Sequence, residues 1–191
     1  EGSGATVVVN VTGANTEVNL AAAYDGNGTY TASYTPANAS PPNDEIAITM
    51  NGIAISGSPY TSQVGAGDAD PVQSTATVPD GQSGSATVIT VQARDSGGNP
   101  LPSGGEVVVV SVTGANNATA VVEDNEDGTY TGTYTPINAG TDNVAITLNT
   151  IPIKDSPFTS TVIPGSASLT QSTITASPTS ITADGSSTST I

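Results

Sequence analysis

Short runs of alternating apolar and polar residues recur along this chain. Residues 143–149 place a valine, an isoleucine and a leucine on one side of an extended backbone and smaller or polar residues on the other. Residues 128–136 place Tyr130 and Tyr134 on one face and a row of threonines on the opposite face. Alternation with a period of two is typical of a strand that is buried on one face only. Both runs therefore predict half-buried strands, and threonine favours the strand conformation.

Five further segments have strand character and are separated by turn-forming clusters of Gly, Asn, Asp and Pro. They are residues 72–78, 86–93, 106–113, 118–123 and 157–162. Seven short strands within one stretch of about 100 residues, with no helical periodicity, indicate an antiparallel sandwich of immunoglobulin type. The predicted fold class is all-β, with tandem immunoglobulin-like β-sandwiches.

The sequence also repeats itself with a period near 100 residues. Val-Thr-Gly-Ala-Asn at residues 11–15 returns at residues 112–116, and Gly-Thr-Tyr at residues 28–30 returns at residues 128–130. Self-similarity at a fixed period is the signature of an array of structural units.

The phase of the repeat divides the chain into three parts. Residues 65–164 form one complete unit, residues 1–64 the C-terminal part of a preceding unit, and residues 165–191 the N-terminal strands of a following unit. We expect both outer units to be incomplete. An interrupted sandwich exposes its inner face and unpaired strand edges to water, which is costly and promotes aggregation.

Two explanations are open for the interrupted units. The sequence, which begins with Glu rather than Met, is a window cut from a longer polypeptide, or neighbouring copies complete one another by strand complementation. Both explanations predict a continuous fibre in which the partner is the chain itself, arranged end to end.

Charge and composition exclude several classes of function. The chain of 191 residues has a net charge of −15, with Arg94 and Lys154 as its cations, and contains no His and no Cys. A Ser-His-Asp or Cys-His nucleophile, an imidazole or thiolate zinc site and a disulfide framework are therefore impossible. No pair of acids lies in a predicted apolar pocket, as a glycosidase would need. We predict that the chain is not an enzyme and needs no cofactor.

The same charge balance disfavours two classes of partner. Nucleic-acid binding requires several Lys or Arg side chains against the phosphates, and this chain has only two. Its excess of carboxylates would also repel an anionic membrane surface. No stretch approaches the roughly 20 consecutive apolar residues of a membrane-spanning helix. We predict neither nucleic-acid binding nor membrane insertion.

The residues of the second half of the unit resemble a known family. Asp-Asn-Glu-Asp-Gly-Thr-Tyr at residues 124–130, Tyr-Thr-Pro at 134–136 and Ser-Pro-Phe at 156–158 resemble the filamin-type immunoglobulin repeat. The first copy carries the same pattern but has Ala-Ser-Pro-Pro at residues 39–42, where the family has Ala-Gly, so we expect a longer corner there. Actin binding by cytoplasmic filamins resides in a separate domain and is not implied.

The opening strands resemble a second group. Ser-Thr-Ile-Thr-Ala-Ser-Pro at residues 172–178, followed by Ala-Asp-Gly at 183–185 and a run of Ser and Thr, is similar to the bacterial immunoglobulin-like domain of invasin and intimin adhesins. Together the two resemblances imply an extracellular adhesion, stalk or scaffold role.

Four Asn-X-Ser/Thr triplets are candidate N-glycosylation sites. Their acceptors are Asn10, Asn27, Asn38 and Asn117. A chain this rich in Asn, Ser and Thr also forms such triplets by chance. The Ser and Thr residues after residue 166 could carry O-linked sugars, although strand propensity alone accounts for them.

One acidic turn is a candidate calcium site. Asp124, Glu126 and Asp127 lie within four residues, and carboxylate oxygens clustered in this way can hold Ca²⁺. The equivalent turn of the first copy contains only Asp25, and no complete calcium-binding loop is present. Solvated turn carboxylates are the simpler interpretation, which we prefer.

Two functions of different classes follow. The first is a non-catalytic structural repeat segment of an extracellular fibre, surface filament or adhesin stalk. The alternative is a recognition module that binds a peptide strand at a sheet edge or a glycan at its loops, with residues 106–113 as the candidate edge. The tyrosines at 30, 34, 130 and 134 could stack on sugars, but their strand spacing favours core packing.

Overall fold

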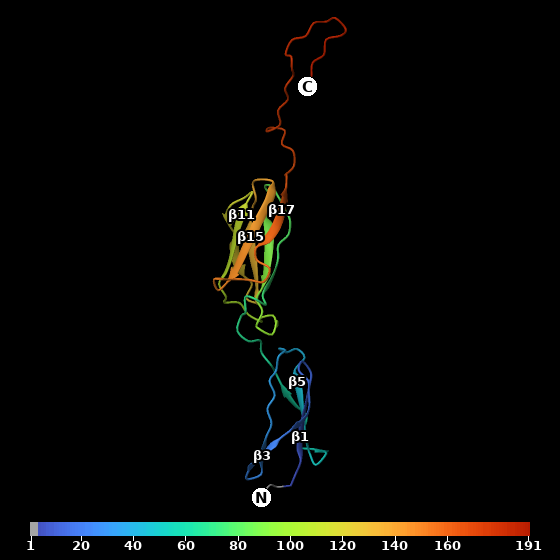
Figure 1. The fold of residues 1–191 in the computed structure, drawn as a ribbon, viewed down its shortest axis with the longest axis vertical. Helices are drawn as coiled ribbons and strands as arrows, with labels where there is room; N and C mark the ends of the chain where they lie inside the picture. Colours follow the sequence, from blue (N-terminus) through green and yellow to red (C-terminus); the bar gives the residue numbers. More distant parts are fainter. Residues whose placement is uncertain (1–3) are drawn as a thin grey trace.

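The computed structural model describes residues 4–191, and every regular element in that range is a β-strand (Figure 1). The first unit contains β1 (Val7–Thr12), β2 (Glu17–Ala21), β3 (Ala23–Gly26), β4 (Thr29–Thr31), β5 (Asp44–Met50), β6 (Ile53–Ala54) and β7 (Tyr60–Ser62). The complete unit contains β8 (Thr75–Thr77), β9 (Gly81–Gln82), β10 (Thr87–Gln92), β11 (Val108–Gly114), β12 (Ala118–Thr119), β13 (Val121–Asp124), β14 (Thr129–Tyr134), β15 (Gly140–Leu148), β16 (Ile151–Pro152) and β17 (Phe158–Ile163).

The complete unit is a sandwich of two sheets. One sheet has the order β13-β14-β10-β8, and the other has the order β12-β11-β15-β17-β9 with β16 added to β15. All pairs are antiparallel except β17 with β9. Ile89, Val91, Val110, Ile146 and Leu148 are fully buried within one hydrophobic cluster. The predicted all-β, immunoglobulin-like sandwich is confirmed.

Local alternation decides which side chains enter this core. Along β14 every second residue is buried, so Tyr130 and Tyr134 face inward and the threonines outward, as predicted. The expected strand at residues 118–123 is divided in two. Its first part, β12, pairs with β11, and its second part, β13, pairs with β14, so the chain crosses from one sheet to the other at the buried Ala120.

The first unit has only part of this architecture. Its sheets have the order β2-β1-β5-β6, with β7 paired to β5, and a separate two-stranded sheet β3-β4. Among residues 4–64 there is no counterpart of β8, β9 or β10. As a result β4 has three residues, whereas its counterpart β14, which pairs with β10, has six.

Residues 164–191 form no strand, contrary to the expected opening strands of a further unit. An isolated bridge joins Ser177 and Thr190, and Leu169 and Ile174 are almost fully exposed. The physical reason is that a strand needs a neighbouring strand to satisfy its backbone groups, and this segment has none within the described residues.

The molecule is elongated, with the two units following one another along its long axis (Figure 1). The C-terminal segment continues in the same direction beyond the complete unit. The joint between the units therefore lies on this axis.

Candidate functional site

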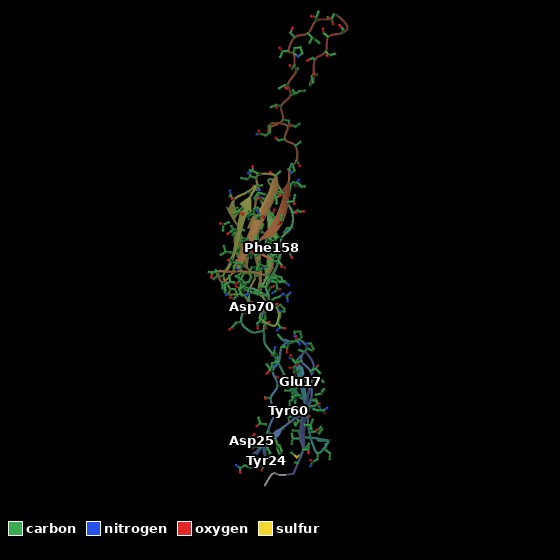
Figure 2. The ribbon with its side chains drawn as sticks, viewed as in Figure 1. Glu17, Tyr24, Asp25, Tyr60, Asp70 and Phe158 are labelled. Atoms are coloured by element: carbon green, nitrogen blue, oxygen red, sulfur yellow. The ribbon has the colours of Figure 1, made fainter. Side chains whose placement is uncertain are left out.

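The joint is organised by the loop of residues 95–99 of the complete unit. The buried carboxylate of Asp95 accepts hydrogen bonds from the backbone N–H of Gly67 at 2.8 Å, of Gly97 at 2.9 Å and of Asn99 at 2.8 Å. Gly67 belongs to the linker, and Asp70, labelled in Figure 2, follows it and donates its N–H to the Arg94 carbonyl at 2.7 Å. Asp95 therefore holds the linker against its own loop.

Asn99 extends the joint into the first unit. Its Oδ1 accepts the N–H of Ala39 at 3.0 Å, and its Nδ2 donates to the carbonyl of Ala37 at 3.0 Å and to the Asp95 carboxylate at 2.9 Å. Ala37 and Ala39 lie in the corner between β4 and β5. One amide side chain thus bridges the two units and is itself oriented by Asp95.

The corner of the first unit is longer than its counterpart, as expected from Ala-Ser-Pro-Pro. Ser40 donates its N–H to the Val64 carbonyl at 2.8 Å, and its Oγ accepts the Val64 N–H at 3.0 Å. The corner is therefore tied to the start of the linker as well as to Asn99. A small hollow of about 390 Å³ between corner, linker and loop completes the joint.

The environment of Asp95 predicts acid sensitivity of the joint. Burial raises the pKa of this carboxyl, but hydrogen bonds from the Asn99 side chain and from the Gly67, Asn99 and Gly97 backbones outweigh it, so the pKa lies below its ordinary value. Because the pKa of Asp95 is lowered in the folded state, its carboxylate stabilises the joint fully above about pH 4. This stabilisation is lost as the pH falls through the pKa of the folded state. The Gly67 amide should report a titration midpoint below about 3.9 by NMR. A midpoint at or above that value would contradict the assignment, and Asp95→Asn should abolish the transition.

Replacing Asn99 with Ala removes both hydrogen bonds to the first unit. With a net value of about 1 kcal/mol per bond, the joint should lose about 1 to 3 kcal/mol, and open arrangements should become populated. Small-angle scattering should show a broader distribution of distances within the particle. Asn125→Ala is the matched control because this side chain bonds only within its own turn, to Thr129 and Thr131. Identical scattering of the two variants would show that Asn99 does not hold the joint.

A buried polar network supports the corner of each unit. In the complete unit the Asp142 carboxylate accepts the Asn116 N–H at 2.8 Å, its side-chain amide at 3.0 Å and the Tyr134 hydroxyl at 3.2 Å. Asn116 Oδ1 in turn accepts the N–H groups of Ile137 and Asn138. The corner after β14 is thereby fixed to the end of β11.

The first unit repeats this network with Asn15, Asp44 and Tyr34. Burial raises the pKa of Asp44, but the hydrogen bonds from Asn15 and Tyr34 outweigh it and the pKa lies below its ordinary value. The same Asn15 Oδ1 accepts the N–H groups of Ala37 and Asn38, so the network sits directly behind the joint. In each unit the network therefore fixes the corner, and in the first unit this corner faces the joint.

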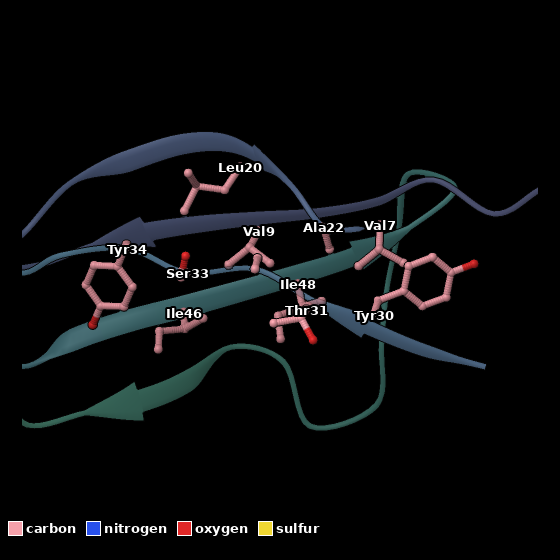
Figure 3. A pocket seen from close by; sticks show the side chains of 11 residues that line it. Val7, Val9, Leu20, Ala22, Tyr30, Thr31, Ser33, Tyr34, Ile46 and Ile48 are labelled. Carbon is pink, nitrogen blue, oxygen red and sulfur yellow. The ribbon is translucent and has the colours of Figure 1, made fainter. Parts of the chain in front are cut away.

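The face of the first unit where β10 would lie is open. It forms an apolar groove of about 320 Å³ (Figure 3). We call this the open groove; the residues that line it include Val7, Val9, Leu20, Tyr34, Ile46 and Ile48. Ile46 and Ile48 are half-buried, whereas their counterparts Val144 and Ile146 are fully buried.

The candidate glycosylation sites differ in geometry. Asn27 lies at the exposed β3–β4 turn and Asn117 is exposed just before β12. Asn10 is half-buried and its Oδ1 accepts the Asn19 N–H at 2.7 Å, while Asn38 donates Nδ2, the atom to which a glycan would be attached, to the Ala14 carbonyl at 3.0 Å. Asn27 and Asn117 are thus the sterically better acceptors.

The acidic turn does not gather into a site. Asp124 accepts the N–H groups of Gly105 and Glu126, and Asp127 accepts the backbone N–H and the hydroxyl O–H of Thr129. In the part of the chain that the structure describes, no three acidic side chains form a group that could hold a metal ion. The three acids share one turn, and the carboxylates of Asp124 and Asp127 stabilise its conformation.

The candidate edge strand at residues 106–113 is not the outermost strand along its whole length. Its C-terminal half is covered by β12, which pairs with Ser111 and Val112, while Val107 and Val109 expose their side chains. Of the four tyrosines, Tyr130 and Tyr134 belong to the core, as the strand spacing predicts. Their counterparts in the first unit line the open groove instead.

Sequence reasoning missed the residues of the joint and of the corner network. The signal for Asn116 was the repeated Val-Thr-Gly-Ala-Asn, which alternation alone does not explain. Its glycine is required too, because Gly114 has φ +112° and an added Cβ would lie 2.6 Å from the Thr141 carbonyl oxygen. Asn99 carried no comparable signal, since its partners lie about 60 residues away in sequence.

Comparisons with known proteins agree with this fold. Residues 68–159 match the family model described as Filamin/ABP280 repeat. Yersinia pseudotuberculosis InvD is 24% identical with a TM-score of 0.56, covering 91% of this chain and 51% of that structure. Invasin, a bacterial integrin-binding protein, is 19% identical with a TM-score of 0.54, covering 84% and 33%. FdeC, an Escherichia coli adhesin, is 20% identical with a TM-score of 0.50, covering 84% and 54%.

The chain therefore spans about half of the InvD and FdeC structures and a third of the invasin structure. The resemblances to filamin-type repeats and to the immunoglobulin-like domains of bacterial adhesins are confirmed at the level of fold. Residues 4–191 contain no helix that is long and apolar enough to cross a membrane.

Proposed function

Because residues 68–159 match the filamin-type repeat, we propose that this chain is a structural segment of an extracellular fibre, surface filament or adhesin stalk. It acts through length, stiffness and surface coating, without catalysis. Its partners are further units of the same kind, joined end to end as a continuous polypeptide or by assembly of copies.

The joint is the observation that carries this proposal. A flexible linker would leave the units free to rotate, whereas Asp95 holds the linker and Asn99 bonds the corner of the preceding unit. The buried network behind the corner recurs in the complete unit, whose corner is shorter, and this recurrence supports a further joint at that end. Repetition of such a joint yields an extended rod.

Surface chemistry suits this role. The net charge of −15 keeps long arrays soluble and discourages sideways pairing of sheet edges. The similar solved structures include an adhesin and an integrin-binding protein, which supports a location at the cell surface or outside the cell. Glycans at Asn27 and Asn117 would stand clear of the sheets and add to the coat.

A second function, recognition of an extended strand, is favoured by the open groove of the first unit. In the complete unit the equivalent place is filled by β10, which pairs with β14. Binding of a strand in the groove would therefore complete the first unit and belongs to the same assembly.

Electron microscopy of the native particle tests the proposed function. We expect units of about 100 residues to recur in line along an extended particle, as in other tandem immunoglobulin-like arrays. Additional density at Asn27 and Asn117 would support the glycan coat. Isolated particles with no serial units would contradict the structural role and favour a stand-alone recognition module.

A further inference from the structure

The open groove has the form of a sandwich from which one inner strand is absent. We propose that it binds an extended, uncharged strand with branched apolar side chains at alternate positions, paired antiparallel to residues 29–34. This inference rests on the proposed function, because such a strand is the second strand of a repeat unit.

The complete unit shows what fills the equivalent place. There β10 pairs antiparallel with β14, with Ile89 opposite Gly132 and Val91 opposite Tyr130. Ile89 and Val91 are fully buried in the core, whereas Val88, which points outward, is about half exposed. By the repeat, the positions opposite these two side chains in the first unit are Ala32 and Tyr30.

The backbone of the first unit lacks the pairing that such a strand supplies. Residues 129–134 are all in strand β14, but in the first unit the strand ends at Thr31 and residues 32–34 belong to no described strand. Unpaired strand edges are templates for the addition of another strand. The open groove and the free edge lie together, so one strand satisfies both.

The lining of the groove sets the chemistry of its occupant. None of the lining residues is charged, and their exposed surface is mainly apolar. A charged strand would lose its hydration without compensation, so branched apolar side chains are the ones that fit.

The exposed C-terminal segment of a second copy is the competing occupant. Its last six residues, at the repeat position where the second strand begins, are Ser-Ser-Thr-Ser-Thr-Ile. Only one of them is a branched apolar residue, against two inward-facing ones in β10. Within these six residues only Ile191 could take the place of an inward-facing residue of β10, so the test below includes a second copy as a separate outcome.

The test uses the full chain and a fluorescent synthetic peptide of residues 83–93, Ser-Gly-Ser-Ala-Thr-Val-Ile-Thr-Val-Gln-Ala. We expect saturable binding of one peptide per chain. Hydrogen exchange at residues 32–34 should slow at least tenfold, with no change at residues 132–134. The peptide with Ile89→Ser and Val91→Ser should bind at least tenfold more weakly, whereas Val88→Ser should bind normally.

Variants of the chain provide a second arm. Ala32→Phe places a ring in the groove and should weaken binding at least tenfold, while Ala54→Phe, on an exposed position of β6, should not. No saturable binding, or equal binding of the two peptide variants, would overturn the proposal. Protection of residues 32–34 that rises with protein concentration and vanishes on deletion of residues 186–191 would assign the groove to a second copy and overturn it too.

Failure of this inference can be told apart from failure of the proposed function. Serial units in the native particle with no peptide binding would refute the groove alone. Peptide binding with isolated native particles would refute the structural role alone.

Discussion

Asp142→Ala is expected to destabilise the complete unit by about 3 kcal/mol or more, because hydrogen bonds to charged groups contribute about 1.5–3 kcal/mol each. The substitution removes, in a buried place, the acceptor of the Asn116 N–H and of the Tyr134 hydroxyl, and one of the two acceptors of the Asn116 side-chain amide. Domains of this size have a free energy of unfolding of about 5–15 kcal/mol, so a large share would be lost. Urea unfolding followed through the β15 amide signals measures the complete unit separately from the first.

Glu123→Ala is the matched control for this prediction. Glu123 lies on the exposed face of β13, so its removal should change the free energy of unfolding by less than about 0.5 kcal/mol. A loss below about 1 kcal/mol for Asp142→Ala would show that the corner network contributes little. Other contacts would then have to fix the corner after β14.

The second large effect concerns the two equivalent isoleucines of the repeat. Ile146→Ala should destabilise the complete unit by about 2–5 kcal/mol, since it leaves a cavity in a closed core. Ile48→Ala should cost the first unit only about 1 kcal/mol, because Ile48 already borders the open groove and removes less apolar surface from water. Amide hydrogen exchange, read separately on β15 and β5, measures both values.

Adding the synthetic peptide of residues 83–93 should change the effect of Ile48→Ala. Saturating the groove should bury Ile48 as Ile146 is buried, so the cost of Ile48→Ala should rise towards that of Ile146→Ala. Equal costs for the two substitutions without peptide would show that the first unit closes its own core. The open groove would then not exist in solution.

Alternation was sufficient to predict the strands of the complete unit. β14 and β15 lie where the period of two placed them, and Tyr130 and Ile146 face inward as expected. The same rule failed for polar residues. Asp142 continues the inward series of β15, two residues before Val144, but a carboxylate in that position looks solvent-exposed until its partners on another strand are known.

Contacts between distant segments account for most of what the sequence did not reveal. Asn99 bonds residues of the preceding unit, and neither partner has a side-chain pattern that marks it. The residues after Pro164 have strand propensity, yet strand formation depends on a partner that propensity does not supply. Strand propensity therefore predicted strands correctly only where a pairing strand was also present.

We propose that Asp95 and Asn99 hold successive units end to end at a fixed angle. Because the chain contains no cysteine, Val18→Cys and Val121→Cys, both at exposed positions, place one spin label on each unit selectively. Pulsed electron paramagnetic resonance should then give one narrow distance distribution between the labels at neutral pH. A broad distribution without a defined maximum, as for two domains on a flexible tether, would contradict the account.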